Sequence, residues 1–147
     1  MTNPKFHLAF HVQDLKATQD FYCQVLGAKP GRQSDNWVDL DLYGHQLSAH
    51  LLVSSPGGTE TKPEAKVEAK VDDDLVPIPH FGLVLPFAEW QALANQVESA
   101  NWSFLLAPKI RFLNQPGEQG TFFIRDPSGN ALEFKGFKDF EQVFAQS

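Results

Sequence analysis

Three polar residues with metal-ligating chemistry lie in segments that are otherwise apolar. His7 is near the start of the alternating segment Phe6–Val12, His80 opens a similar segment at 80–85, and Glu133 lies between apolar neighbours in a third segment. A carboxylate inside a curved sheet is costly unless it is paired or bound to metal. Two neutral imidazoles and one carboxylate suit Fe(II), and also Mn, Ni, Co or Zn, and leave coordination positions open for other oxygen ligands.

A histidine on one strand is more often structural than a ligand, so the spacing needs support from the rest of the chain. That support comes from an internal repeat, because His7 and His80 hold equivalent positions in two similar halves. The two rings would meet across a pseudo-twofold axis, and Glu133 would complete the set. We therefore treat His7, His80 and Glu133 as candidate metal ligands.

The elements that must position these residues follow from periodicity and from capping signals. In the first half, we expect a strand, a helix capped by Asp14 and ended by Gly27, a turn at Pro30-Gly31, and strands at 37–42 and 46–53. In the second half, we expect a strand, a helix opened by Pro86, and three strands, followed by a short C-terminal helix at 138–147; these three strands are expected at 103–112, 121–125 and 130–135. Each half reads as β-α-β-β, with a fourth strand in the second.

The predicted fold class is α+β, with a single domain over 1–147 made of two modules. The first module covers 1–53, and the second covers 79–147 with a C-terminal extension. Between them, 54–78 is expected to be a linker or flap, because it holds Pro-Gly-Gly and lacks aromatic residues and periodicity. The acidic triplet Asp72–Asp74 is interpreted as a solvated charge run, since no glycine and glutamate follow at calcium-loop spacing.

Composition excludes several classes of function. The chain has 147 residues, with 12 Lys and Arg against 18 Asp and Glu, for a net charge of −6. An acidic chain without a basic run is a poor nucleic-acid binder, and no apolar run approaches the ~20 residues of a membrane span. Cys23 is the single cysteine, which excludes an intrachain disulfide. We expect a cytoplasmic protein that acts on a small molecule.

Several motifs together resemble the vicinal-oxygen-chelate superfamily, which includes glyoxalase I, bleomycin-resistance proteins and extradiol dioxygenases. The most specific is Asp126-Pro-Ser-Gly-Asn-Ala-Leu-Glu133-Phe134, and the others are the segments 7–15, 20–27 and 80–85. More narrowly, the segments 44–50, 110–112 and 116–119 resemble a group of small proteins classed with predicted extradiol-type dioxygenases.

The resemblance implies two βαβββ modules whose curved, barrel-like sheets enclose a metal held by His7, His80 and Glu133. It implies a divalent metal, foremost Fe(II), and a substrate with two neighbouring oxygens. The expected activity is that of an extradiol-type dioxygenase. A glyoxalase-like isomerase or epimerase and a non-catalytic drug-binding protein are the alternatives. We also expect a homodimer, with the modules paired either within one chain or between two.

Two residues on the last strand of the first half decide how open the site is. Setting Gly44 beside Gly129 places Ser48 opposite Glu133, where glyoxalase I has a fourth ligand, so the resemblance implies a site with three ligands. A register slip of two residues would place His50 there instead. We assign His50 as a candidate acid or base, since an imidazole titrates near neutral pH. A fourth-ligand role and a purely structural role stay open.

Three further residues are candidates for substrate contacts or for support of the ligands. His11 shares the face of His7 but lies about 13 Å farther along the strand. Asp39 could contact the substrate, hold a ligand histidine from behind, or simply be solvated. Arg111 could bind a substrate carboxylate with two parallel hydrogen bonds, or it could form a surface salt bridge.

Overall fold

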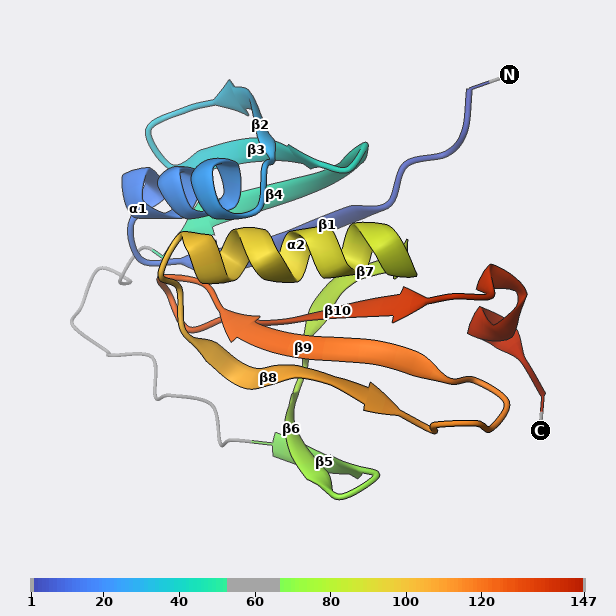
Figure 1. Cartoon of the computed structure of the whole chain (residues 1–147). Coiled ribbons are helices and arrows are strands. Elements are labelled where there is room, and N and C mark those ends of the chain that lie inside the picture. The colour runs from blue at the N-terminus through green and yellow to red at the C-terminus, as the bar shows by residue number, and fades with distance from the viewer. Residues whose placement is uncertain (1, 53–66, 147) are drawn as a thin grey trace. The chain divides into compact units, whose positions relative to one another are not determined.

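The computed structural model describes residues 2–52 and 67–146, which form two compact units (Figure 1). The first unit contains 2–52 and the turn Asp126–Gly129, and the second contains 67–125 and 130–146. The α+β class with two modules is confirmed, and each module holds an open four-stranded sheet. None of the helices in these residues is long and apolar enough to cross a membrane.

The first unit is a βαβββ module with strand order β1-β4-β3-β2. Its strands are β1 (His7–Val12), β2 (Lys29–Gln33), β3 (Trp37–Leu42) and β4 (His45–Leu51), and β1 runs parallel to β4. The helical segment is α1 (Leu15–Asp20), which continues as the π-helical turn η1 (Phe21–Val25). As predicted, Asp14 caps the helix, because its carboxylate accepts a hydrogen bond from the Ala17 amide.

The turn expected at Pro30-Gly31 is in fact part of the edge strand β2. All five of its residues are exposed, and its pairing with β3 is interrupted by a register shift between Pro30 and Gln33. An edge strand tolerates proline because one of its sides makes no ladder hydrogen bonds. Exposure on both faces removes the hydrophobic alternation by which a strand is predicted from sequence.

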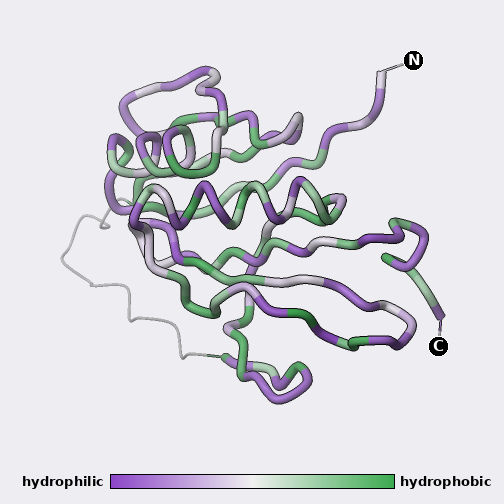
Figure 2. The backbone as a smooth tube through the Cα atoms, viewed as in Figure 1, coloured by the Kyte–Doolittle hydropathy of each residue, from purple (hydrophilic) through white to green (hydrophobic). Residues whose placement is uncertain are grey.

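The second unit repeats the module with strand order β7-β10-β9-β8. Its elements are β7 (Phe81–Pro86), α2 (Phe87–Ser99), β8 (Phe104–Arg111), β9 (Gln119–Arg125), β10 (Ala131–Phe137) and the terminal 3₁₀ turn η2 (Phe140–Phe144). The α2 helix alternates between hydrophobic and hydrophilic residues along its turns (Figure 2). Its apolar side buries the predicted residues Trp90, Leu93 and Val97.

Trp90 fits against the sheet because two strand residues lack side chains. A Cβ atom at Gly120 or Gly136 would come within 2.6 Å or 2.5 Å of Trp90 atoms. The indole nitrogen donates a hydrogen bond to the Phe134 carbonyl oxygen at 2.9 Å. The helix is thereby fixed over β10, the strand that carries Glu133.

Part of the segment expected to be a linker or flap is an ordered hairpin. β5 (Val67–Val71) and β6 (Asp74–Ile78) pair antiparallel, with Asp72 in a left-handed turn conformation at φ 54°. The sequence does alternate between apolar and charged residues at Val67, Ala69 and Val71. This alternation is too short to indicate a strand within a segment that is otherwise polar. The rest of the expected linker, 53–66, lies outside the described residues.

Candidate metal site

His80 and Glu133, which are 53 positions apart in sequence, lie side by side in the second unit. His80 immediately precedes β7, and Glu133 lies on β10 with Gly82 of β7 as its register partner. The distance from His80 Nε2 to Glu133 Oε1 is 3.1 Å, and the two side chains are 22% and 10% exposed. Two of the three predicted ligands are therefore brought together within one module.

The hydrogen bonds of His80 define which ring nitrogen faces the carboxylate as an acceptor. Nδ1 lies 2.7 Å from the Pro77 carbonyl oxygen. A carbonyl oxygen only accepts, so Nδ1 carries a proton and Nε2 is the nitrogen that faces Glu133. Two acceptors that face each other at this distance need a cation between them, either a proton on Nε2 or a metal. Metal-ligating histidines commonly donate their other N–H to a backbone carbonyl in this way.

The second carboxylate oxygen of Glu133, Oε2, is held by a hydrogen bond. Thr121 on β9 donates a hydrogen bond from Oγ1 to Glu133 Oε2 at 2.6 Å, and Thr121 is fully buried. The ring of Phe123, the register partner of Glu133, packs edge-on against His80 with centroids 4.9 Å apart. The side chains of Glu133 and His80 are therefore both held in place by contacts with neighbouring residues of the protein.

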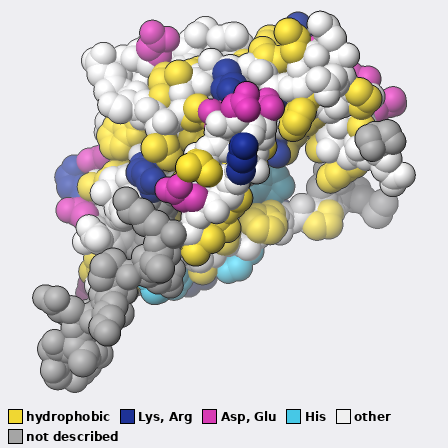
Figure 3. Space-filling view, turned by 90° about the horizontal axis from the view of Figure 1, so that it is seen from below, with side chains coloured by type: hydrophobic (Ala, Val, Ile, Leu, Met, Phe, Trp, Pro, Cys, Tyr) yellow, Lys and Arg dark blue, Asp and Glu magenta, His cyan; other side chains and the backbone are white. Residues whose placement is uncertain are grey.

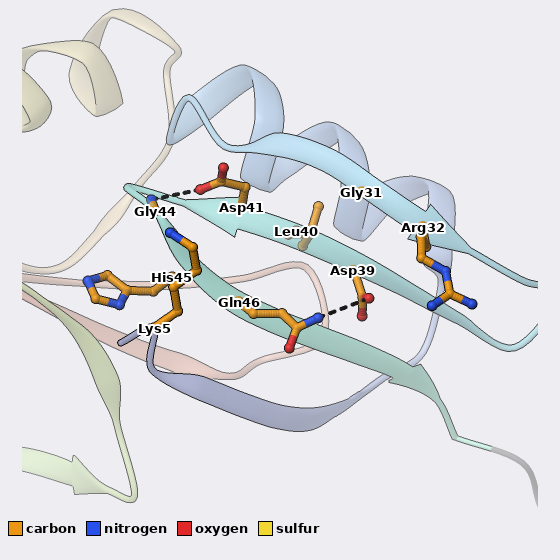
Figure 4. Close-up of a pocket in the computed structure, with 9 residues that line it drawn as sticks. All are labelled: Lys5, Gly31, Arg32, Asp39, Leu40, Asp41, Gly44, His45 and Gln46. Carbon is orange, nitrogen blue, oxygen red and sulfur yellow. Dashed lines mark hydrogen bonds between the residues drawn. The ribbon is translucent and has the colours of Figure 1, made fainter. Parts of the chain in front are cut away.

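His7 has equivalent support in the first unit. Its Nδ1 lies 2.8 Å from Gln46 Oε1, and the Gln46 amide nitrogen donates to Asp39 Oδ2 at 3.2 Å (Figure 4). The second contact fixes the amide orientation, so the amide oxygen accepts from Nδ1 of His7 and Nε2 is the nitrogen not used by this bond. Ser48 Oγ donates to Asp39 Oδ1 at 2.6 Å and completes the chain of hydrogen bonds. Asp39 thus anchors the hydrogen-bonded chain behind His7, and its support of a metal ligand stays a prediction.

Gln46 was missed by the sequence reasoning, which took only strand position and charge into account. Gln46 could have been found only from the strand pairing, because it is the register partner of His7 on the neighbouring parallel strand. Thr121 was likewise predicted to lie on a strand but was given no role. Its hydroxyl reaches Glu133 only because of the register in which β9 pairs with β10, and this register was not predicted.

Ser48 holds the same register position in the first module that Glu133 holds in the second. Ser48 pairs with Ala9, two residues after His7, and Glu133 pairs with Gly82, two residues after His80. The register supports the ungapped alignment of the two halves over the two-residue slip. His50 is the register partner of both His11 and Trp37, and His50 and His11 are exposed.

His7 belongs to the first unit, whereas His80 and Glu133 belong to the second. In the described part of the chain, no three His, Cys, Asp or Glu side chains are grouped so as to hold a metal ion. The complete ligand set stays a prediction. The donor atoms nevertheless fit a divalent metal, because each imidazole bonds through Nδ1 and leaves Nε2 for a ligand role, and the Glu133 carboxylate faces Nε2 of His80.

Arg111 is buried, and so it does not form the surface salt bridge that was one of its two predicted roles. It is 2% exposed, and its Nη1 contacts Asp74 Oδ2 at 3.0 Å and the Val71 carbonyl at 2.8 Å. Lys109 Nζ contacts the same Asp74 oxygen at 2.7 Å. The hydrogen bond and charge of Lys109, with the charge of Arg111, lower the pKa of Asp74 despite an opposing effect of desolvation.

The acidic triplet is therefore not simply a solvated charge run, because its last member ties the hairpin to the sheet. A cavity of about 130 Å³ lies beside this contact, and its lining includes Arg111, His80, Glu133 and Phe123. A second cavity, of about 260 Å³, lies in the first unit beside Gln46 and Asp39 (Figure 4). The first cavity is thus lined by two candidate ligands, His80 and Glu133, whereas the second is lined by Gln46 and Asp39, which lie behind His7.

The most specific sequence motif has a structural role at its first residue. Asp126 Oδ2 accepts a hydrogen bond from the Tyr22 hydroxyl at 2.9 Å, and both residues are buried. Asp126 Oδ1 accepts from the Ser128 amide, and Ser128 Oγ accepts from the Gln13 amide. Burial first, and then Asp126, raise the pKa of Tyr22.

Figure 3 shows one face of the molecule, on which acidic and basic side chains of the described residues are interspersed.

The chain is similar to several solved structures. A glyoxalase/bleomycin resistance protein/dioxygenase from Alicyclobacillus acidocaldarius is 29% identical, with a TM-score of 0.74 and 97% of each chain covered. Integron cassette protein VCH_CASS1 of V. cholerae is 23% identical, with a TM-score of 0.59 and coverage of 93% of this chain and 97% of that one. A lactoylglutathione lyase from Agrobacterium tumefaciens is 17% identical, with a TM-score of 0.62 and coverage of 93% and 96%.

The last two similarities concern the fold alone, and no curated protein matches the sequence significantly. A sequence model of one superfamily, however, matches residues 6–134, which include all three candidate ligands. The chain belongs to the Glyoxalase/Bleomycin resistance protein/Dioxygenase superfamily.

Proposed function

We propose that this protein is a metal-dependent enzyme of extradiol-dioxygenase type, which acts on a small molecule with two neighbouring oxygens. His7, His80 and Glu133 would hold one divalent metal, foremost Fe(II). The three would meet where two modules pair, within one chain or between the chains of a homodimer. When bound, the metal supplies a Lewis acid and a template for the two substrate oxygens and, as iron, a redox centre.

The observation that carries the proposal is the contact between His80 Nε2 and Glu133 Oε1. The ring is held by Pro77 and the carboxylate by Thr121, so both ligand atoms are oriented in advance. Such supporting hydrogen bonds typically change metal affinity 10- to 100-fold when they are removed. The same arrangement at His7, through Gln46, supports its inclusion in the set.

The chain's own residues would divide the remaining work. Ser48 stands at the position of a fourth ligand, and its hydroxyl is a poor ligand that is already bonded to Asp39. This favours an open three-ligand site over the glyoxalase I arrangement. His50 is exposed on the strand of Ser48, two residues on and so on the same face, where it would accept a proton from a substrate hydroxyl.

Elemental analysis tests the metal centre directly. Protein purified without chelators and without oxygen should hold about one metal per chain, and Glu133→Gln should lose it. Glu98→Gln, an exposed carboxylate on α2, is the matched control and should keep the metal. Wild-type protein that holds no metal after incubation with Fe(II), Zn and Ni would contradict the proposal.

The reaction class needs a separate measurement. Iron-loaded wild-type protein should consume oxygen when catechols are added, and His50→Ala should keep the metal but lose turnover. Loss of metal in His50→Ala would instead make His50 a ligand. A metal-loaded protein that consumes no oxygen with any catechol would contradict the dioxygenase assignment.

A further inference from the structure

Arg111 has hydrogen-bond donors that no described residue satisfies. Its Nη1 is used by Val71 and Asp74, but Nε and Nη2 are buried and have no partner among residues 2–52 and 67–146. An unsatisfied buried donor destabilises the folded protein, and more so when it is charged. Unpaired donors of this kind are rare in native proteins and call for a partner beyond the described residues.

The two unsatisfied groups lie on the same edge of the guanidinium plane. Nε–H and Nη2–H point in parallel and are spaced to match the two oxygens of one carboxylate. Asp74 occupies the opposite side of the group through Nη1, and it therefore holds the guanidinium without filling this edge.

The cavity beside Arg111 has the size and lining for one charged terminal group. Its volume of about 130 Å³ is below the roughly 300–1,000 Å³ of pockets that enclose a whole ligand. Val71, Val76 and Phe123 contribute apolar walls, which strengthen a charge contact by excluding water. Lys135 also lines the cavity and adds a second positive charge.

The same cavity is lined by His80 and Glu133. A molecule anchored at Arg111 would therefore extend towards the proposed metal ligands. We propose that Arg111 binds a carboxylate of the substrate through Nε and Nη2, so that the substrates of this protein are carboxylic acids. The identification of the bound carboxylate as part of a substrate rests on the proposed function. The carboxylate site itself requires no metal.

The first experiment titrates the full-length protein with benzoate and with benzamide, its uncharged counterpart of the same shape. Nuclear magnetic resonance follows the Nε–H signal of Arg111. Benzoate should shift this signal and bind at least tenfold more tightly than benzamide. Equal affinities, or an unchanged Arg111 signal, would overturn the proposal. Inorganic phosphate that binds more tightly than benzoate at this signal would also overturn it, in favour of a tetrahedral oxyanion.

Variants test whether the two parallel hydrogen bonds matter. Arg111→Lys keeps the charge but loses the planar pair of donors, so benzoate should bind about 10- to 100-fold more weakly. Arg32→Lys, on the edge strand β2, is the control and should bind benzoate as the wild type does. Unchanged benzoate affinity in Arg111→Lys would contradict the proposal. If Arg111→Lys does not fold, the titration of the wild-type protein with benzoate, followed at the Arg111 Nε–H signal, tests the proposal by itself.

A third variant separates this inference from the metal centre. Glu133→Gln should lose metal and still bind benzoate, because Arg111 does not depend on the metal. A wild-type protein that binds benzoate at Arg111 but never binds metal would refute the proposed function and leave the carboxylate site standing. The reverse result, metal bound without any benzoate contact at Arg111, would refute the carboxylate site alone.

Discussion

At the scale of single residues, the candidate site depends on hydrogen bonds that lie behind the ligands. Thr121 is a clear case, because it is buried and its hydroxyl donates a hydrogen bond to Glu133. The hydroxyl fixes one carboxylate oxygen, and the other is left to face His80. The candidate ligands were proposed from residue type and repeat position, but this hydrogen-bond partner depends on the strand register and could not be.

Thr121→Val removes the hydroxyl while it keeps the shape of the side chain. Glu133 loses one orienting bond, so we expect metal affinity to fall about 10- to 100-fold. Thr121→Ser should restore most of the affinity, because it returns the hydroxyl. Competition with a chromophoric chelator measures both. Equal metal affinity in Thr121→Val and the wild type would show that Thr121 does not position Glu133.

At the scale of elements, the two parallel strand pairs decide where ligands sit. Gly82 on β7 faces the backbone of Glu133 so closely that a Cβ atom there would overlap the Glu133 carbonyl. The obstacle is backbone rather than a flexible side chain, and relief would require the two strands to separate.

Gly82→Ala should therefore lower both stability and metal affinity. Overpacking of this kind typically costs about 1–3 kcal/mol of unfolding free energy. Glu133→Gln offers a contrast, because it should lose metal while it keeps the strand pairing. Urea unfolding and metal analysis on both variants give the comparison. A Gly82→Ala protein with wild-type stability would mean that β7 and β10 can shift apart without cost.

The hairpin β5–β6 is tied to the sheet by the contacts of Asp74 with Lys109 and Arg111. Because these contacts lower the pKa of Asp74 in the folded state, they stabilise the protein above the ordinary aspartate pKa of 3.8. The contribution should disappear as the pH falls through the lowered folded-state pKa. Wild type should therefore exceed Asp74→Asn in urea midpoint at pH 6, and the difference should shrink towards pH 3. A difference that is constant with pH would contradict this role.

At the scale of the whole molecule, the repeat made most of the fold predictable. Both modules, both helices and the equivalence of Ser48 with Glu133 follow from periodicity and from the aligned glycine turns. The strand β2 and the hairpin β5–β6 did not follow, because one is exposed on both faces and the other is masked by charge. The cavity at Arg111 was also beyond the sequence, since its burial depends on Val71 and Asp74 of that hairpin.

The segment that joins β9 to β10 links the two units through the covalent chain. The turn Asp126–Gly129 belongs to the first unit, whereas both strands that flank it belong to the second. Tyr22 anchors this turn through its hydrogen bond to Asp126. The stability of the turn should therefore affect the unfolding of both units.

Tyr22→Phe should lower the free energy of unfolding by about 1–3 kcal/mol at pH 7, because it removes the hydroxyl that donates to Oδ2 of the buried Asp126 carboxylate. The pKa of Tyr22 is raised in the folded state, so its contribution is complete below the unfolded tyrosine pKa of about 10 and is lost as the pH rises above it. Urea unfolding at pH 7 and pH 10.5, followed by tryptophan fluorescence, should show the difference between wild type and variant shrinking at the higher pH. Tyr43→Phe, at an exposed ring, is the control and should show little change at either pH. A Tyr22→Phe protein as stable as wild type at pH 7 would mean that the turn is held by Ser128 and the backbone instead.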